Sequence, residues 1–219
     1  MVLRHTKIKW LILVIILVLL GVKLVPMAVQ TVNADSHWNL ILVNYENRIP
    51  FGRKVDLTEL SNGQSVDSRI YPSLQQMFND MRSQGVYPVV ASGYRTSKRQ
   101  KELMAEKVQE FISQGYSKSN AKTEAKKWVA EDGFSEHQTG LAVDINADGI
   151  HSSGQQVYAW LADNAWKYGF ILRYPDGKTD LTKTDYEPWH YRYVGAEDAA
   201  KIHESGLCLE EYIEKTAQQ

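Results

Sequence analysis

The sequence predicts an α+β fold in which a small antiparallel sheet is flanked by helices. Short strand-like runs are mixed with helix-period segments in no regular β-α-β order, so the strands need not be parallel. The stretch LAVDINA (141–147) alternates apolar and polar residues, as a strand with one buried face does. With a single cysteine, Cys208, the chain has no intramolecular disulfide, so the fold must rely on its apolar core and on any metal that it binds.

The first 35 residues differ in character from the rest of the chain. Basic residues precede an uncharged apolar run over residues 10–22, the order found in a secretory signal peptide or an uncleaved signal anchor. Both interpretations stay open. The run is shorter than the ~20 residues of a spanning helix, but Lys23 can snorkel and extend it, whereas VNA, ending at Ala34, suits cleavage. In either case we expect residues 36–219 outside the cytoplasm, because the positive flank stays inside.

Residues 36–219 fit one domain with an apolar core. We expect residues 36–70 to be irregular, with short strand-like pieces such as NLILVN and RKVDLTEL. Apolar residues recur at helical spacing between positions 74 and 81, and Gly85 is suited to end that helix. The run VYPVVAS (86–92) then predicts a short buried strand.

A polar segment from Ser97 to Asp132 predicts two surface helices that break at Gly115. In the strand that follows it, Val143 and Asp144 point to opposite faces. The remaining elements are read from short sequence runs: a helix that contains VYAWLA and ends near a glycine, two strands in FILRYP and WHYRYVG, and two helices in AEDAAKIHESG and LEEYIEK.

The charge balance argues against a nucleic-acid binder. The chain carries 25 Lys and Arg against 26 Asp and Glu, and four of the basic residues lie in the N-terminal segment, so the domain itself is acidic. The basic stripe that neutralises phosphates is missing from the sequence. We therefore expect no nucleic-acid partner, and we expect the chain to act as a monomer.

Two histidines each have an acidic residue close by in the sequence and lie beside a predicted strand. His137 and Asp144 lie on either side of Gly140 in SEHQTGLAVDI, and His190 follows Glu187 in EPWHYRYV. A lone histidine in a strand is more often structural than a metal ligand. Two segments that each pair a histidine with a carboxylate, in one disulfide-free chain, favour a metal site instead. Two imidazoles and one carboxylate around an open position are the arrangement of a catalytic zinc site.

Glu187 then remains outside the ligand set, three residues before a ligand. Pro188 biases Glu187 to an extended conformation. On the strand that follows, His190 and Arg192 share one face, and Trp189 and Tyr191 share the other. A carboxylate so close to a catalytic metal is suited to accept a proton from water.

Three segments, SGYRTSKRQ (92–100), SEHQTGLAVDI (135–145) and EPWHYRYVG (187–195), together resemble the VanY-type D-alanyl-D-alanine carboxypeptidases. These are zinc peptidases of peptidoglycan, with relatives that are L,D-carboxypeptidases, and their fold is shared with the hedgehog signalling domain. The resemblance covers roughly residues 38–212. It implies a hedgehog-like fold for this domain.

The resemblance also implies roles for individual residues. The zinc ligands would be His137, Asp144 and His190, with Glu187 as the general base and Arg95 as the cation that meets a substrate carboxylate or carbonyl oxygen. The residues expected to contact the substrate are Gln100, Ser135 and Trp189. A structural ion pair for Arg95 and a turn or capping hydroxyl for Ser135 remain alternatives.

The sequence therefore predicts an extracytoplasmic zinc carboxypeptidase, secreted into the cell wall or anchored in the membrane by residues 1–35. Its expected substrates are peptidoglycan stem peptides that end in D-alanine. An L,D-carboxypeptidase acting on tetrapeptide stems is the first alternative, and an endopeptidase cutting cross-bridges is the second. A non-catalytic hedgehog-like binding module is the alternative from another class, but such a module has no use for a base at Glu187.

Overall fold

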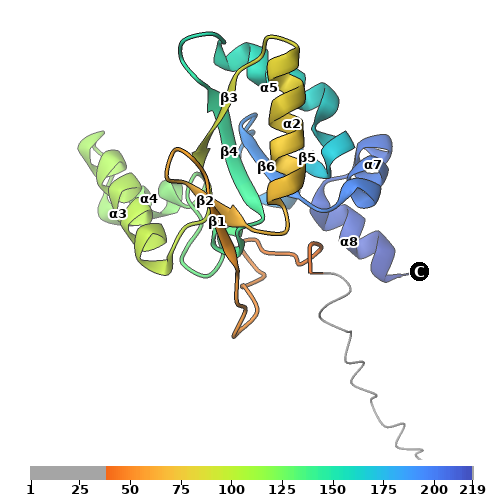
Figure 1. Cartoon of the computed structure of the whole chain (residues 1–219). Helices are drawn as coiled ribbons and strands as arrows, with labels where there is room; N and C mark the ends of the chain where they lie inside the picture. The colour runs from red at the N-terminus through yellow and green to blue at the C-terminus, as the bar shows by residue number, and fades with distance from the viewer. Residues whose placement is uncertain (1–37, 219) are drawn as a thin grey trace, which may run out of the picture. The chain divides into compact units, whose positions relative to one another are not determined.

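The computed structural model describes residues 38–218, so the segment expected to be a signal or anchor (1–35) lies outside the described residues. Among residues 38–218, none of the helices is both long and apolar enough to cross a membrane. The described part is an α+β domain built around a four-stranded antiparallel sheet, as predicted (Figure 1).

The sheet has the strand order β3-β4-β6-β5, and a separate hairpin pairs β1 with β2. The strands are β1 (Leu57–Glu59), β2 (Ser65–Asp67), β3 (Pro88–Ser92), β4 (Ala142–Ala147), β5 (Phe170–Leu172) and β6 (His190–Tyr193). The helices are α2 (Tyr71–Ser83), α3 (Ser97–Ser113), α4 (Lys118–Ala125), α5 (Gly154–Asn164), α6 (Thr179–Thr182), α7 (Ala196–Ser205) and α8 (Leu209–Ala217). Two 3-10 helices, η1 (Glu136–Thr139) and η2 (Ala165–Tyr168), complete the described elements.

One face of the sheet packs against helices α2 and α5. The apolar stripe of α2 is buried, and its chain turns away at Gly85, whose φ of +78° favours glycine. From the sheet, Val143, Ile145 and Tyr191 enter the same core. A second, smaller core joins Ile171 and other residues of the opposite face to α7 and α8. The alternation predicted for β4 is therefore confirmed.

Helices α3 and α4 form a pair beside the sheet (Figure 1). The two predicted surface helices are thus confirmed, including the break at Gly115, where φ is +95°. Thr96 caps the start of α3 by accepting a hydrogen bond from the backbone N–H of Arg99. Helix α3 buries only Gln100 fully, which agrees with its solvated character.

Two local predictions were wrong. The apolar run NLILVN forms no strand. The backbone carbonyls of Asn39 and Ile41 accept hydrogen bonds from the side chain of Arg192 and not from a neighbouring strand. Trp189 lies in a turn and not in the strand, since the N–H of His190 bonds back to the carbonyl of Glu187 at 3.1 Å. Strand β6 accordingly begins at His190.

Candidate active site

The side chains of His137, Asp144 and His190 meet on the sheet face opposite the larger core. His137 lies in η1, which ends at Gly140 with a φ of +72°. This turn leads the chain into β4, where Asp144 is the direct cross-strand partner of His190 in β6. Neighbouring side chains on one face of an antiparallel pair lie close together. The strand register therefore brings together residues that are 46 positions apart.

The donor atoms of these three residues converge. His190 Nδ1 lies 3.0 Å from Asp144 Oδ1, and His137 Nε2 lies 3.4 Å from Asp144 Oδ2. One donor atom from each residue fits within a span of 4.8 Å, and both histidines are buried. Nitrogen and carboxylate donors in this number and spacing fit a zinc ion that keeps an open position.

The ring of His137 is held from its far side. Its Nδ1 lies 2.8 Å from the backbone carbonyl of Gly93, which can only accept, so Nδ1 carries the proton and Nε2 offers its lone pair to the centre. Gly93 has to be glycine, since a Cβ there would lie 2.2 Å from the carbonyl oxygen of Ser65. An imidazole whose second nitrogen donates to a carbonyl is the usual partner of a metal.

Glu187 lies beside this group without being part of it. Its Oε2 is 3.7 Å from His190 Nδ1, and the residue is 8% exposed. Burial raises the pKa of Glu187 to about 7; His190 and Arg95 oppose this rise, and the carboxylates of Asp144 and Asp185 add to it. A carboxyl group with a pKa near neutrality is suited to accept and return a proton at physiological pH.

Arg95 lines the same cavity and also pairs with Asp144. Its Nη2 donates to Asp144 Oδ2 at 2.8 Å, and its Nε donates to Ser92 Oγ at 2.9 Å. Both interpretations of Arg95 thus have a structural basis, because the side chain faces the cavity and makes an ion pair. Ser135 is buried in the cavity wall and precedes η1, but its hydroxyl makes no capping hydrogen bond.

The other two predicted substrate contacts lie in different surroundings. Trp189 lines the cavity next to His190. Gln100 does not line the cavity: it is the fully buried residue of α3, and its Nε2 donates to the carbonyl of Ala130 at 2.7 Å. The structure therefore brings Trp189 to the site and places Gln100 behind its wall.

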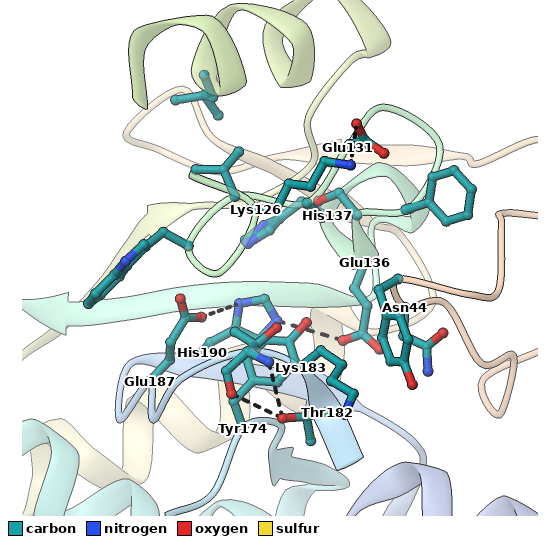
Figure 2. Close-up of a pocket in the computed structure, with 18 of the residues that line it drawn as sticks. Asn44, Lys126, Glu131, Glu136, His137, Tyr174, Thr182, Lys183, Glu187 and His190 are labelled. Carbon is teal, nitrogen blue, oxygen red and sulfur yellow. Dashed lines mark hydrogen bonds and ion pairs between the residues drawn. The ribbon is translucent and has the colours of Figure 1, made fainter. Parts of the chain in front are cut away.

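The cavity is larger than the group of three donors. Its volume is about 490 Å³. The wall opposite the sheet comes from α3 and from the segment after α4, through Leu103, Trp128 and Val129. Lys126 reaches across this wall and pairs with Glu131 at 3.0 Å (Figure 2). A ligand in this cavity can extend well past the histidines.

The sequence interpretation missed three residues around His190. Glu136 is fully buried with its Oε2 3.6 Å from His190 Nε2, on the side of the ring away from Glu187 (Figure 2). The Tyr174 ring packs on His190 with centroids 4.8 Å apart, and Arg173 lies over Tyr174. No local sequence pattern marks these residues: a buried glutamate needs charged partners, and the partners of Glu136, Arg173 and Arg192, are distant in the sequence.

Comparison with known proteins places these features in a family. Residues 63–196 match the VanY family, described as D-alanyl-D-alanine carboxypeptidase. A D-alanyl-D-alanine carboxypeptidase of Enterococcus faecalis is 58% identical over 179 residues, which cover 82% of this chain and 67% of that protein. The solved structure of VanYB in complex with D-alanine-D-alanine is 58% identical, with a TM-score of 0.80, over 81% of this chain and 98% of that one.

A second solved structure concerns the metal. A mutant of the D,D-pentapeptidase VanY in complex with Zn(II) is 58% identical to this chain, with a TM-score of 0.79. The similarity covers 80% of this chain and 99% of that chain. The fold seen here, with its small antiparallel sheet and flanking helices, is thus shared with a protein that was solved in complex with Zn(II).

Proposed function

Because this chain belongs to the VanY D-alanyl-D-alanine carboxypeptidase family, we propose that it is a zinc-dependent carboxypeptidase that removes the terminal D-alanine from peptidoglycan stem peptides. The observation that carries this proposal is the convergence of His137, Asp144 and His190 beside a buried glutamate. A binding module would need no titratable carboxylate there. The base at Glu187 therefore favours turnover over binding alone.

In this proposal His137 Nε2, an oxygen of Asp144 and His190 Nδ1 hold the zinc ion. When bound, zinc supplies Lewis-acid chemistry: it polarises a carbonyl group and makes water a stronger acid at neutral pH. The side chains of the protein carry out the proton transfers and bind the substrate.

Glu187 acts as the base and then as the acid. Its carboxylate accepts a proton from the attacking water, whose oxygen bonds to the scissile carbonyl carbon. As the C–N bond breaks, Glu187 passes this proton to the amine of the departing D-alanine. Burial favours the return of the proton, because it raises the pKa of the Glu187 carboxyl above its ordinary value.

Arg95 recognises the terminal carboxylate of the substrate. Its guanidinium has one nitrogen on Ser92 and another on Asp144, and it lines the cavity beside the three donors. A planar guanidinium suits bidentate binding of a carboxylate. Such binding would select free C-termini and so restrict the enzyme to carboxypeptidase action.

The decisive experiment uses purified residues 36–219 and muropeptides that end in one or two D-alanines, each with and without a chelator. We expect release of D-alanine from the pentapeptide stem, loss of this activity with chelator and recovery with zinc. Preference for the tetrapeptide would identify the L,D-carboxypeptidase alternative. Release of cross-linked fragments would identify an endopeptidase, and absence of any release would leave the binding module.

We also propose that the enzyme works at the outer side of the membrane, held there or secreted through its first 35 residues. The basic and apolar order of that segment supports this proposal. Cell fractionation after expression of the full chain distinguishes the outcomes: a membrane-bound product of full length indicates an anchor, a shorter product outside the cell indicates cleavage, and a cytoplasmic product contradicts both.

A further inference from the structure

Two buried polar atoms beside the candidate metal centre face each other without a hydrogen-bond partner in the described part of the chain. They are Glu136 Oε2 and His190 Nε2, separated by 3.6 Å. Glu136 is 2% exposed and His190 is 4% exposed. Buried polar atoms normally find partners, so a carboxylate oxygen placed opposite a ring nitrogen calls for an explanation.

The orientation of Glu136 is fixed by two buried cations. Its Oε1 accepts from Arg173 Nε at 2.8 Å and from Arg192 Nη1 at 2.7 Å. Arg173 also pairs with Glu210, through hydrogen bonds of 2.9 and 2.6 Å. Two arginines and two glutamates thus balance their charges. Since both arginines occupy Oε1, the other oxygen of Glu136 is left to point at His190.

We propose that Glu136 is a positioning residue that selects the tautomer of His190. A carboxylate can only accept, so it holds the proton on Nε2 and leaves the lone pair of Nδ1, which lies 3.0 Å from Asp144 Oδ1, available to the metal. This arrangement repeats that of His137, whose Nδ1 donates to the carbonyl of Gly93. The inference rests on the proposed metal site and adds to it the group that prepares His190 as a ligand.

Substitution of Glu136 by glutamine gives a sharp test, because the amide has one acceptor and one donor end. Arg173 and Arg192 can only donate, so the amide oxygen must face them and the NH₂ group must face His190. The NH₂ group of the glutamine then donates to His190 Nε2, so the ring proton moves to Nδ1. A protonated Nδ1 cannot bind the metal. The shape of the side chain is kept, but the tautomer is reversed.

Glu210→Gln is the matched control. Glu210 pairs with the same Arg173 and is similarly placed in the charge cluster, but its hydrogen bonds go to Arg173 and Asn44 and none goes to His190. Both substitutions remove one negative charge from the cluster and should lower the melting temperature. Only the substitution at Glu136 should change the ligand properties of His190.

The measurement is the zinc dissociation constant, from competition with a chelator, for the wild type, Glu136→Gln and Glu210→Gln. We expect Glu136→Gln to bind zinc roughly 10–100-fold more weakly, the usual effect of removing such a partner, and Glu210→Gln to stay within about threefold of the wild type. Equal zinc affinity in wild type and Glu136→Gln, or equal losses in both variants, would overturn the proposal in favour of a purely structural ion cluster.

If Glu136→Gln does not fold, the wild type itself provides the test. Two-dimensional ¹H–¹⁵N spectra of the zinc-loaded protein should show His190 with a proton on Nε2 and the metal on Nδ1. A proton on Nδ1 would overturn the role of Glu136 while leaving the zinc peptidase intact. A wild type that binds no zinc would instead reject the proposed function.

Discussion

At Glu187, burial and position combine to favour proton transfer. The carboxylate lies 3.7 Å from His190 Nδ1 and is not one of the three converging donors. Glu187→Gln keeps the shape and cannot accept a proton. We expect normal zinc content and a kcat that is roughly 10²–10⁴-fold lower on a D-alanine-terminated muropeptide.

The matched control for this variant is Glu131→Gln, which changes a glutamate of the same cavity that pairs with Lys126. This variant should keep a kcat near that of the wild type. Loss of zinc from Glu187→Gln would show that Glu187 is a ligand, and a normal kcat would place the base elsewhere.

The role of Arg95 can be tested by changing the C-terminus of the substrate as well as the residue. If its guanidinium binds the terminal carboxylate, the wild type should prefer a peptide acid over the same peptide with a C-terminal amide. Arg95→Ala should lose roughly 10²-fold in kcat/KM on the acid, since two charged hydrogen bonds are worth about 3 kcal/mol, and little on the amide. The measurement is the acid-to-amide ratio of kcat/KM in both proteins.

Zinc content must be measured on the same preparations, because Arg95 also pairs with Asp144. An unchanged acid-to-amide ratio, together with weaker zinc binding, would mean that Arg95 serves only as the structural partner of Asp144.

At the scale of the elements, periodicity predicted most of the fold. Alternation in β4 and the helical stripe of α2 depend on local sequence, so residues 141–147 and 74–81 were assigned correctly. The NLILVN run was not, because its apolar residues pack against a sheet without pairing with it, and hydropathy alone does not distinguish these cases. The short helix α6 has too few residues to show a period.

The residues of the candidate site also fall into those that the sequence could predict and those that it could not. His137, Asp144 and His190 could be predicted because their spacing in the sequence is a recognisable motif. Glu136 could not, since its significance depends on two arginines that come from other strands and loops, and no local pattern marks such a long-range cluster. The position of Gln100 behind the cavity wall likewise depends on how α3 packs on the segment after α4.

Trp128 tests whether the α3–α4 region selects the substrate. Its side chain lines the cavity yet is 45% exposed, so an aromatic surface is available to residues that precede the scissile bond. We expect Trp128→Ala to lower kcat/KM on a stem pentapeptide roughly tenfold, equivalent to about 1.4 kcal/mol, and to leave hydrolysis of the D-alanyl-D-alanine dipeptide within about twofold of the wild type.

Tyr116→Ala is the control for this variant. Tyr116 is 43% exposed in the same helical region but does not line the cavity. Equal losses on dipeptide and pentapeptide in Trp128→Ala would mean that Trp128 supports the catalytic groups and does not contact the distal part of the substrate.

At the scale of the whole molecule, the three donors join η1 and β4, which follow each other in the chain, to β6, whose His190 lies 46 positions after Asp144. His137 comes from η1, Asp144 from the central strand β4 and His190 from its neighbour β6. The larger core lies on the other face of this sheet and does not include these side chains. The domain should therefore fold without metal and become more stable when zinc joins the three elements.

Thermal unfolding with and without zinc measures this linkage. A ligand that binds only the folded state at 100 times its Kd adds about 2.7 kcal/mol, which corresponds to roughly 5–11 °C in Tm for a domain of this size. We expect a rise of this order with zinc, and a cooperative transition at lower temperature in chelator. His137→Ala should unfold at the same temperature in both conditions, because only two of the three donors remain. A zinc-dependent rise of the same size in His137→Ala would place the ion elsewhere in the chain, and an unfolded protein in chelator would show that the metal is required for folding as well as for hydrolysis.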